Sequence, residues 1–179
     1  DRAHPDYDIN SAEAYVRLYY DTLDNRNWPH SGAIATWEWI QSVDVLGADD
    51  YDFSQSVLRA GGAHSWGRNT FFGGLEFDYT ADGDAPVQNR FRIGGFTKLS
   101  GFTQDQLSGQ QVALLRSGYY RSLGKILLSQ AYAGFSLEYG NVFENRSDIN
   151  LAPEDAVLAG SVFVGLDTIL GPIYLGYGH

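Results

Sequence analysis

Cysteine and methionine are both missing from this chain of 179 residues, and cationic residues are few. Without cysteine, the chain can form neither a disulfide framework nor a thiolate metal site, and it has no cysteine nucleophile. Its 12 Lys and Arg residues, against 22 Asp and Glu residues, give a formal net charge of −10 and form no run. Because a phosphate-binding surface needs clustered cations, the composition argues against a nucleic-acid partner.

Long apolar runs are missing as well. No uninterrupted apolar stretch approaches the roughly 20 residues that a membrane-spanning helix needs, and no signal peptide opens the chain. Any membrane must therefore be crossed by strands. The length suits one domain, residues 1–179. The 44% hydrophobic content, 21 glycines and 12 tyrosines favour an ordered fold of strands and tight turns.

Alternation with a period of two is the main signal in the sequence. Ala133, Phe135 and Leu137 alternate with Ser136 and Glu138, which gives one apolar and one mixed face. Such runs predict eight strands, each about as long as a tilted strand needs to cross a bilayer. They cover residues 12–23, 32–44, 52–63, 69–80, 110–121, 127–140, 155–167 and 171–178.

The connections between these runs alternate in length. The short ones lie at 24–31, 64–68, 122–126 and 167–172, and the long ones at 45–51, 81–109 and 141–154. Tight turns at one end and long polar loops at the other are typical of an outer-membrane barrel with periplasmic turns. The fold class expected is therefore all-β, an antiparallel transmembrane β-barrel with about eight strands present.

Alternation alone also allows a soluble or small outer-membrane eight-stranded barrel that binds a small hydrophobic ligand. A soluble barrel would place its more apolar face inward and its mixed face in water. Trp37, Trp39 and Tyr79 argue mildly against it, since aromatic residues near strand ends suit a membrane girdle. Solubility that depends on detergent would separate the two hypotheses.

The stretch "AHSWG" around Ser65 is close to the nucleophile elbow of serine hydrolases, G-x-S-x-G. An elbow needs a turn from a strand into a helix, but this stretch joins two predicted strands. His30, in another short turn, is the one histidine that could share a barrel end with Ser65. A hairpin turn with Trp66 at the membrane interface is the favoured interpretation, and an enzyme using Ser65 with His30 remains the alternative.

Two further stretches stand out. Residues 21–32 (DTLDNRNWPHSG) are rich in turn formers, and a structural turn explains them fully. Residues 90–102 (RFRIGGFTKLSGF) place apolar side chains inside the longest loop, and burying each is worth about 1.5–3 kcal/mol. This loop is therefore expected to fold back into a wide lumen. Its apolar side chains are Phe91, Ile93, Phe96, Leu99 and Phe102.

Three spaced motifs together resemble the C-terminal barrel of the bacterial surface antigen superfamily, which includes the outer-membrane protein assembly factor and the two-partner secretion transporters. The resemblance implies a sixteen-stranded barrel whose sixth extracellular loop folds into the lumen, with an L/V-R-G-F/Y motif at its tip. The motifs comprise a periplasmic turn (Asp21, Thr22, Leu23, Asp24, Asn25, Trp28, Pro29, Gly32), a lumenal loop (Gly94, Gly95, Phe96, Leu99, Ser100, Gly101, Phe102) and residues 170–176 (LGPIYLG).

Ser100 stands where the superfamily usually has arginine in the loop tip, so the guanidinium that would anchor the loop is missing. Serine at this position resembles the patatin-like autotransporter branch of type V secretion. Any phospholipase activity would then reside in an upstream passenger, and this chain would hold no catalytic, cofactor or metal site. The resemblance implies outer-membrane lipid, the barrel assembly machinery and the passenger domain as partners.

The topology also predicts where the chain ends lie. With periplasmic short turns, both ends fall on the extracellular side, whereas whole outer-membrane barrels keep both ends periplasmic. The run at 171–178 resembles the penultimate strand, so the chain is expected to hold strands eight to fifteen of sixteen and to lack the final strand. Open sheet edges would favour a homodimer.

Overall fold

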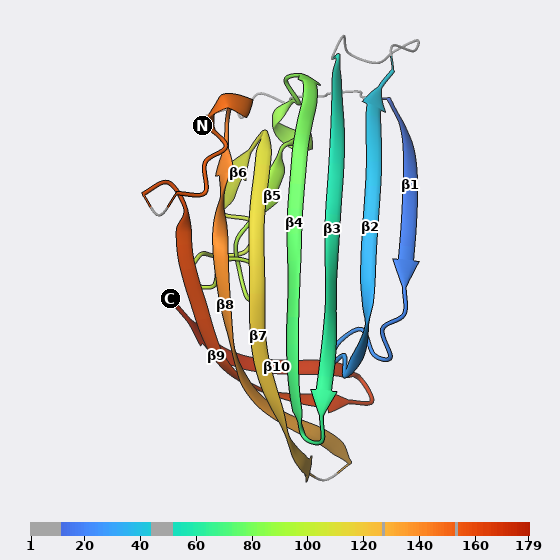
Figure 1. Ribbon diagram of the computed structural model, residues 1–179, viewed down its shortest axis with the longest axis vertical. Coiled ribbons are helices and arrows are strands. Elements are labelled where there is room, and N and C mark those ends of the chain that lie inside the picture. Colours follow the sequence, from blue (N-terminus) through green and yellow to red (C-terminus); the bar gives the residue numbers. More distant parts are fainter. Residues whose placement is uncertain (1–11, 44–51, 127, 153) are drawn as a thin grey trace, which may run out of the picture.

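One curved antiparallel sheet dominates the computed structural model, which describes residues 12–43, 52–126, 128–152 and 154–179 (Figure 1). Its eight strands follow one another in chain order, so every neighbour in the sheet is also the next long strand in sequence. They are β1 (Glu13–Asp21), β2 (Ser31–Ser42), β3 (Phe53–Trp66), β4 (Asn69–Gly83), β7 (Gln111–Ile126), β8 (Ser129–Phe143), β9 (Val157–Thr168) and β10 (Gly171–Gly178).

The connection between β4 and β7 carries a small second sheet. Strands β5 (Phe91–Ile93) and β6 (Leu107–Gly109) pair with each other, after the short 3-10 turn η1 (Val87–Asn89). A second such turn, η2 (Arg146–Asp148), lies between β8 and β9. Among the residues described, no helix has the length and apolar character needed to cross a membrane.

The outer face of the sheet is apolar and exposed. Alternate side chains on each strand point to this face, as the period of two requires. Their exposed fractions are large for aliphatic residues: 60% for Val16, 51% for Leu115, 71% for Leu158 and 74% for Leu175. A surface of this kind, continuous over the strands, is unusual for a protein surface in water and is typical of contact with lipid.

The inner face holds the polar and charged residues. Arg59 on β3 lies opposite Glu76 on β4, and the hydroxyls of Ser136 and Ser161 lie 2.6 Å apart across β8 and β9. The connection between β4 and β7 packs on this mixed face, and the apolar face stays exposed. This arrangement is the reverse of the one that a soluble ligand-binding barrel requires.

The eight expected strands are all present, but several turns differ from those predicted. Strand β7 continues through residues 122–126, which the sequence placed in a turn, because a β-bulge at Ser122 and Gly124 absorbs the irregularity. Strand β3 likewise continues to Trp66, so only residues 67 and 68 separate it from β4. The turn after β3 lies where the sequence predicts it but is shorter, whereas the turn predicted at 122–126 is wrong in position, because β7 runs to Ile126.

Short and long connections alternate along the sheet as expected. The connections from β1 to β2, β3 to β4, β7 to β8 and β9 to β10 lie at one end of the sheet, and those from β4 to β7 and from β8 to β9 at the other. The loop expected at 45–51 lies outside the described residues. Strands β1 and β10 are the edges of the sheet and do not pair with each other in the part of the chain that the structure describes.

Candidate functional site

The connection between β1 and β2, residues 22–30, is here called the entry turn. Its carboxylates and amides hold the backbone: Asp24 Oδ1 accepts the N–H groups of His30 and Ser31, and Asn25 Oδ1 accepts those of residues 27 and 28. Gly32 has a φ of +101°, and a Cβ there would lie 2.1 Å from the carbonyl oxygen of Thr22. The predicted turn motif therefore serves to fold this segment.

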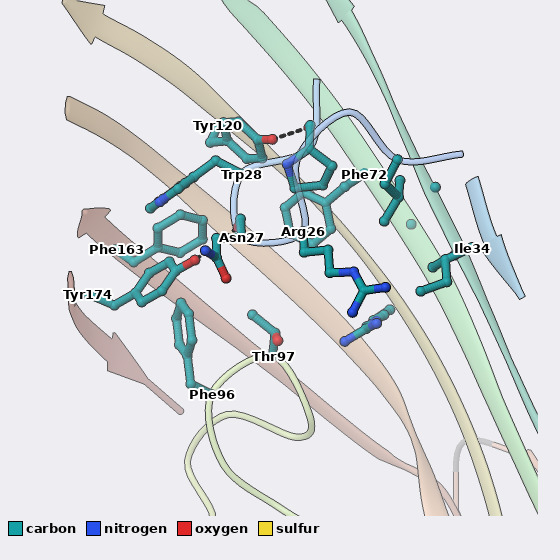
Figure 2. A pocket seen from close by; sticks show the side chains of 16 residues that line it. Arg26, Asn27, Trp28, Ile34, Phe72, Phe96, Thr97, Tyr120, Phe163 and Tyr174 are labelled. Atoms are coloured by element: carbon teal, nitrogen blue, oxygen red, sulfur yellow. Dashed lines mark hydrogen bonds between the residues drawn. The ribbon is translucent and has the colours of Figure 1, made fainter. Parts of the chain in front are cut away.

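Trp28 at the tip of the entry turn is inserted among aromatic side chains of the opposite strands (Figure 2). It is 1% exposed, and its ring stacks on Tyr132 of β8 at 4.3 Å and on Tyr174 of β10 at 4.8 Å. The Tyr120 hydroxyl donates to the carbonyl of Pro29, and the Tyr174 hydroxyl donates to that of residue 27. The entry turn thus joins β1 and β2 to β8 and β10 across the inner face.

The Asp24 carboxylate has a pKa below its ordinary value of 3.8. Partial desolvation raises this pKa, but the N–H groups of Ser31 and His30 and the nearby His30 ring lower it by more. A lowered carboxyl pKa stabilises the fold above the pKa of the unfolded chain. That contribution is lost as the pH falls through the folded-state pKa.

Replacing Asp24 tests this role. Asp24→Ala is expected to lower the free energy of unfolding by about 1–3 kcal/mol at pH 7, because two backbone N–H groups lose a charged acceptor. The difference from wild type should shrink as the pH falls below about 4, the ordinary carboxyl pKa of the unfolded chain, and through the lower pKa of the folded state. Urea titration in lipid vesicles measures both. Asp24→Asn, which keeps an acceptor oxygen but no charge, is the matched control and should lose less than Asp24→Ala; wild-type stability of Asp24→Asn would contradict the charge argument.

Residues 84–110 form a loop, here called the inner loop, that packs on the inner face as expected. Ile93 and Leu99 are completely buried, and Phe91 is 8% exposed. They form one cluster with Val57, Val112, Leu114 and Ala159, which lie on β3, β7 and β9. Burial of these side chains fixes the loop against three strands of the sheet.

Polar contacts hold the tip of the inner loop. The N–H of Ser100 donates to Glu138 Oε2 at 2.9 Å, and Ser100 is 3% exposed against Gly178 of β10. Two residues earlier, Lys98 Nζ lies 3.0 Å from Glu76 Oε2. Glu76 also pairs with Arg59 at 3.1 Å. The loop is therefore anchored by a lysine and a backbone amide, with no guanidinium at the tip.

Removing this lysine is expected to loosen the tip of the inner loop. Lys98→Met should raise the rate of chymotrypsin cleavage at Phe96 and Phe102 about tenfold or more, because a charge-assisted contact is worth about 1.5–3 kcal/mol. Cleavage is followed by mass spectrometry of the protein in vesicles. Lys125→Met, at the end of β7, is the control and should cleave at the wild-type rate. Equal rates for both variants would show that the apolar cluster alone fixes the loop.

The entry turn and the tip of the inner loop enclose a cavity of about 500 Å³ (Figure 2). Phe96 reaches it from the loop and lies 5.2 Å from the ring of Phe163 and 5.4 Å from that of Tyr174. Arg26 from the entry turn and Arg116 from β7 also line it. The predicted loop and turn motifs therefore meet at one place on the inner face.

Ser65 lies in β3 near its end and has structural contacts. Its hydroxyl donates to the backbone carbonyl of His30 at 2.8 Å and lies 2.8 Å from the hydroxyl of Thr70. The His30 imidazole is directed elsewhere, toward Asp24 at 3.5 Å and the Tyr132 hydroxyl at 3.3 Å. No helix follows the turn after β3, so the strand–turn–helix of a nucleophile elbow is absent from this described segment.

Aromatic side chains occupy two levels of the outer face. Near the short turns, Trp66, Phe71, Tyr119 and Phe135 form a row with ring centroids 5.1–5.8 Å apart. Toward the other end, Phe77 and Tyr79 stack on β4, and Trp37 and Trp39 lie on β2. Phe71 and Tyr79 are eight residues apart, about 27 Å along the strand. Two such levels are typical of the girdles of a membrane barrel.

Three residues of the inner face were not singled out from the sequence as site residues: Lys98, Arg116 and Glu138. Lys98 lay within the loop motif, and Arg116 and Glu138 occupied inward positions of their strands. Charged residues at inward positions are the signal that could have found the two strand residues. Their contacts with the inner loop depend on the path of the loop, which alternation does not give.

A comparison with protein-family models matches the chain to the Omp85 superfamily domain over residues 6–164. A search among curated proteins finds no match. The matched residues include the entry turn, the inner loop and all strands up to most of β9.

Proposed function

Because the chain belongs to the Omp85 superfamily, the bacterial surface antigen family of outer-membrane β-barrel proteins of secretion and assembly, we propose that it forms the wall of a translocator barrel. The barrel secretes or displays an N-terminal passenger at the outer membrane. The eight strands then make one half of a sixteen-stranded barrel.

The observation that carries this proposal is the two-faced sheet with a chain segment folded onto its polar face. Lipid contact explains why Leu115, Leu158 and Leu175 are exposed, since their burial in the bilayer removes the cost of hydrating them. A water-filled lumen explains why Arg59 and Glu76 face the other way. The inner loop needs a lumen wide enough to hold it, which a barrel of eight strands lacks.

A patatin-like phospholipase is the passenger proposed, on the resemblance of the loop tip with Ser100. The hydrolytic residues then belong to that passenger, and this chain contributes no catalytic group, cofactor or metal ligand. Outer-membrane lipid and the barrel assembly machinery are its other partners. Pairing of exposed sheet edges would give a homodimer.

A reporter assay tests the proposal. A signal peptide and a protease-sensitive reporter are joined upstream of the barrel-forming polypeptide that contains this chain, and the fusion is expressed in a Gram-negative host. Protease added to intact cells is expected to remove the reporter, whereas the reporter without the barrel should stay protected in the periplasm. If the reporter stays protected although the barrel is folded and heat-modifiable, the translocator role is contradicted, but the barrel fold is not.

A further inference from the structure

The cavity between the entry turn and the inner loop is cationic although the chain is strongly acidic. Two arginines line it and no Asp or Glu does, in a chain whose formal net charge is −10. Arg26 is paired with Asp21 at 3.0 Å. Arg116 forms no ion pair with any residue that the structure describes.

Two carboxylates lie near Arg116, and both contact the inner loop. Glu138, directly opposite Arg116 in the register of β7 and β8, accepts the N–H of Ser100. Glu76, diagonal to it on β4, is paired with Arg59 and Lys98. On the β4 side the register partner is Gly74, whose missing side chain leaves room for the guanidinium. An arginine in a partly enclosed cavity whose lining contains no carboxylate favours an anionic ligand.

The rest of the cavity is aromatic. Phe96, Phe163 and Tyr174 stand together on one side, as Figure 2 shows, and Trp28 and Phe72 extend this wall. Thr97 adds a hydroxyl near the tip of the inner loop. The volume of about 500 Å³ lies within the range of small-molecule sites, roughly 300–1,000 Å³. A ligand that fits both the arginine and the aromatic wall has a single negative group and an apolar body.

We propose that this cavity binds a single-chain amphiphilic anion, an alkyl carboxylate, with the carboxylate on the Arg116 guanidinium and the alkyl chain against Phe96, Phe163 and Tyr174. The guanidinium binds a carboxylate through two parallel N–H donors. The aromatic wall removes the alkyl chain from water. The ligand would lie between the entry turn and the inner loop, both of which line the cavity.

Calorimetric titration of decanoate into the protein in lipid nanodiscs tests the proposal, with empty nanodiscs subtracted to remove partition into the bilayer. Saturable binding of one decanoate per chain is expected. Arg116→Gln should weaken it about tenfold or more, which corresponds to about 1.4 kcal/mol or more. Arg121→Gln, on the outer face of the same strand, is the matched control and should bind as wild type. Heat-modifiability of each variant confirms that it folds.

Two further titrants separate the contributions of the ligand's charge and of its alkyl chain. Decyltrimethylammonium should not bind saturably, and inorganic phosphate should bind far more weakly than decanoate. Equal binding of the cationic amphiphile, or an unchanged affinity in a folded Arg116→Gln protein, would overturn the proposal. Phosphate binding as tight as decanoate binding would overturn the role of the aromatic wall.

Discussion

Leu115→Arg is expected to destabilise the folded protein in a bilayer by about 2–4 kcal/mol, the cost of an arginine at the bilayer midplane of a membrane barrel. Leu115 is 51% exposed on the outer face of β7. It is four residues from Tyr119, which belongs to one aromatic level. It is also four residues from Gln111, which pairs with Tyr79 of the other level. It therefore lies midway between the two aromatic levels. Urea titration of the vesicle-bound protein measures the loss.

Leu123→Arg is the matched control on the same strand. Leu123 is 54% exposed, nearly the same as Leu115, but it lies beyond Tyr119 near the short turns. An arginine close to the membrane interface costs about 0–1 kcal/mol. If both variants kept wild-type stability, the outer face would be in contact with water, as surface leucines of a soluble protein are.

Trp28→Ala is expected to cost about 3–5 kcal/mol, the usual loss for a large buried aromatic side chain. The indole is enclosed by Tyr120, Tyr132 and Tyr174, so its removal takes away the ring contacts that hold the entry turn on these strands. The entry turn should then detach from β8 and β10. Hydrogen exchange of residues 22–30 is expected to rise strongly in this variant.

Trp66→Ala is the comparison for this experiment. Trp66 also lies beside a short turn, but it is 59% exposed on the outer face. Its loss should reduce stability by no more than about 1.5 kcal/mol, since its remaining contacts are edge-on aromatic ones. A similar loss in both variants, with no rise in exchange of the entry turn, would contradict the role of Trp28 in joining the two sides of the sheet.

The strands could be predicted from the sequence because each obeys one local rule. Side chains at alternate positions of a strand face different surroundings. The face of a residue such as Leu137 or Glu138 can therefore be predicted without knowing which strands lie next to it. The alternation of short and long connections then fixes the order of the strands. The bulge at Ser122 and Gly124 escaped this reasoning, because a strand that continues through an irregularity resembles a turn in sequence.

The functional face could be predicted only in part. The apolar side chains of the inner loop predicted that this loop is buried, and Ile93 and Leu99 are completely buried. Which strands receive them depends on contacts far apart in the chain, as between Ser100 and Glu138. The entry turn was read correctly as a turn. That Trp28 enters the aromatic cluster of β8 and β10 needs the curvature of the whole sheet, which no local pattern contains.

The assignment of the two faces is tested most directly by single cysteines on β2, which the cysteine-free chain permits without background. Four variants, Ala33→Cys, Ile34→Cys, Ala35→Cys and Thr36→Cys, are labelled with a fluorophore after reconstitution into vesicles. Quenching by a lipid-soluble agent should affect labels at 33 and 35, and quenching by a water-soluble agent those at 34 and 36. Water-soluble quenching at all four positions, or no alternation, would contradict a sheet that separates lipid from an aqueous lumen.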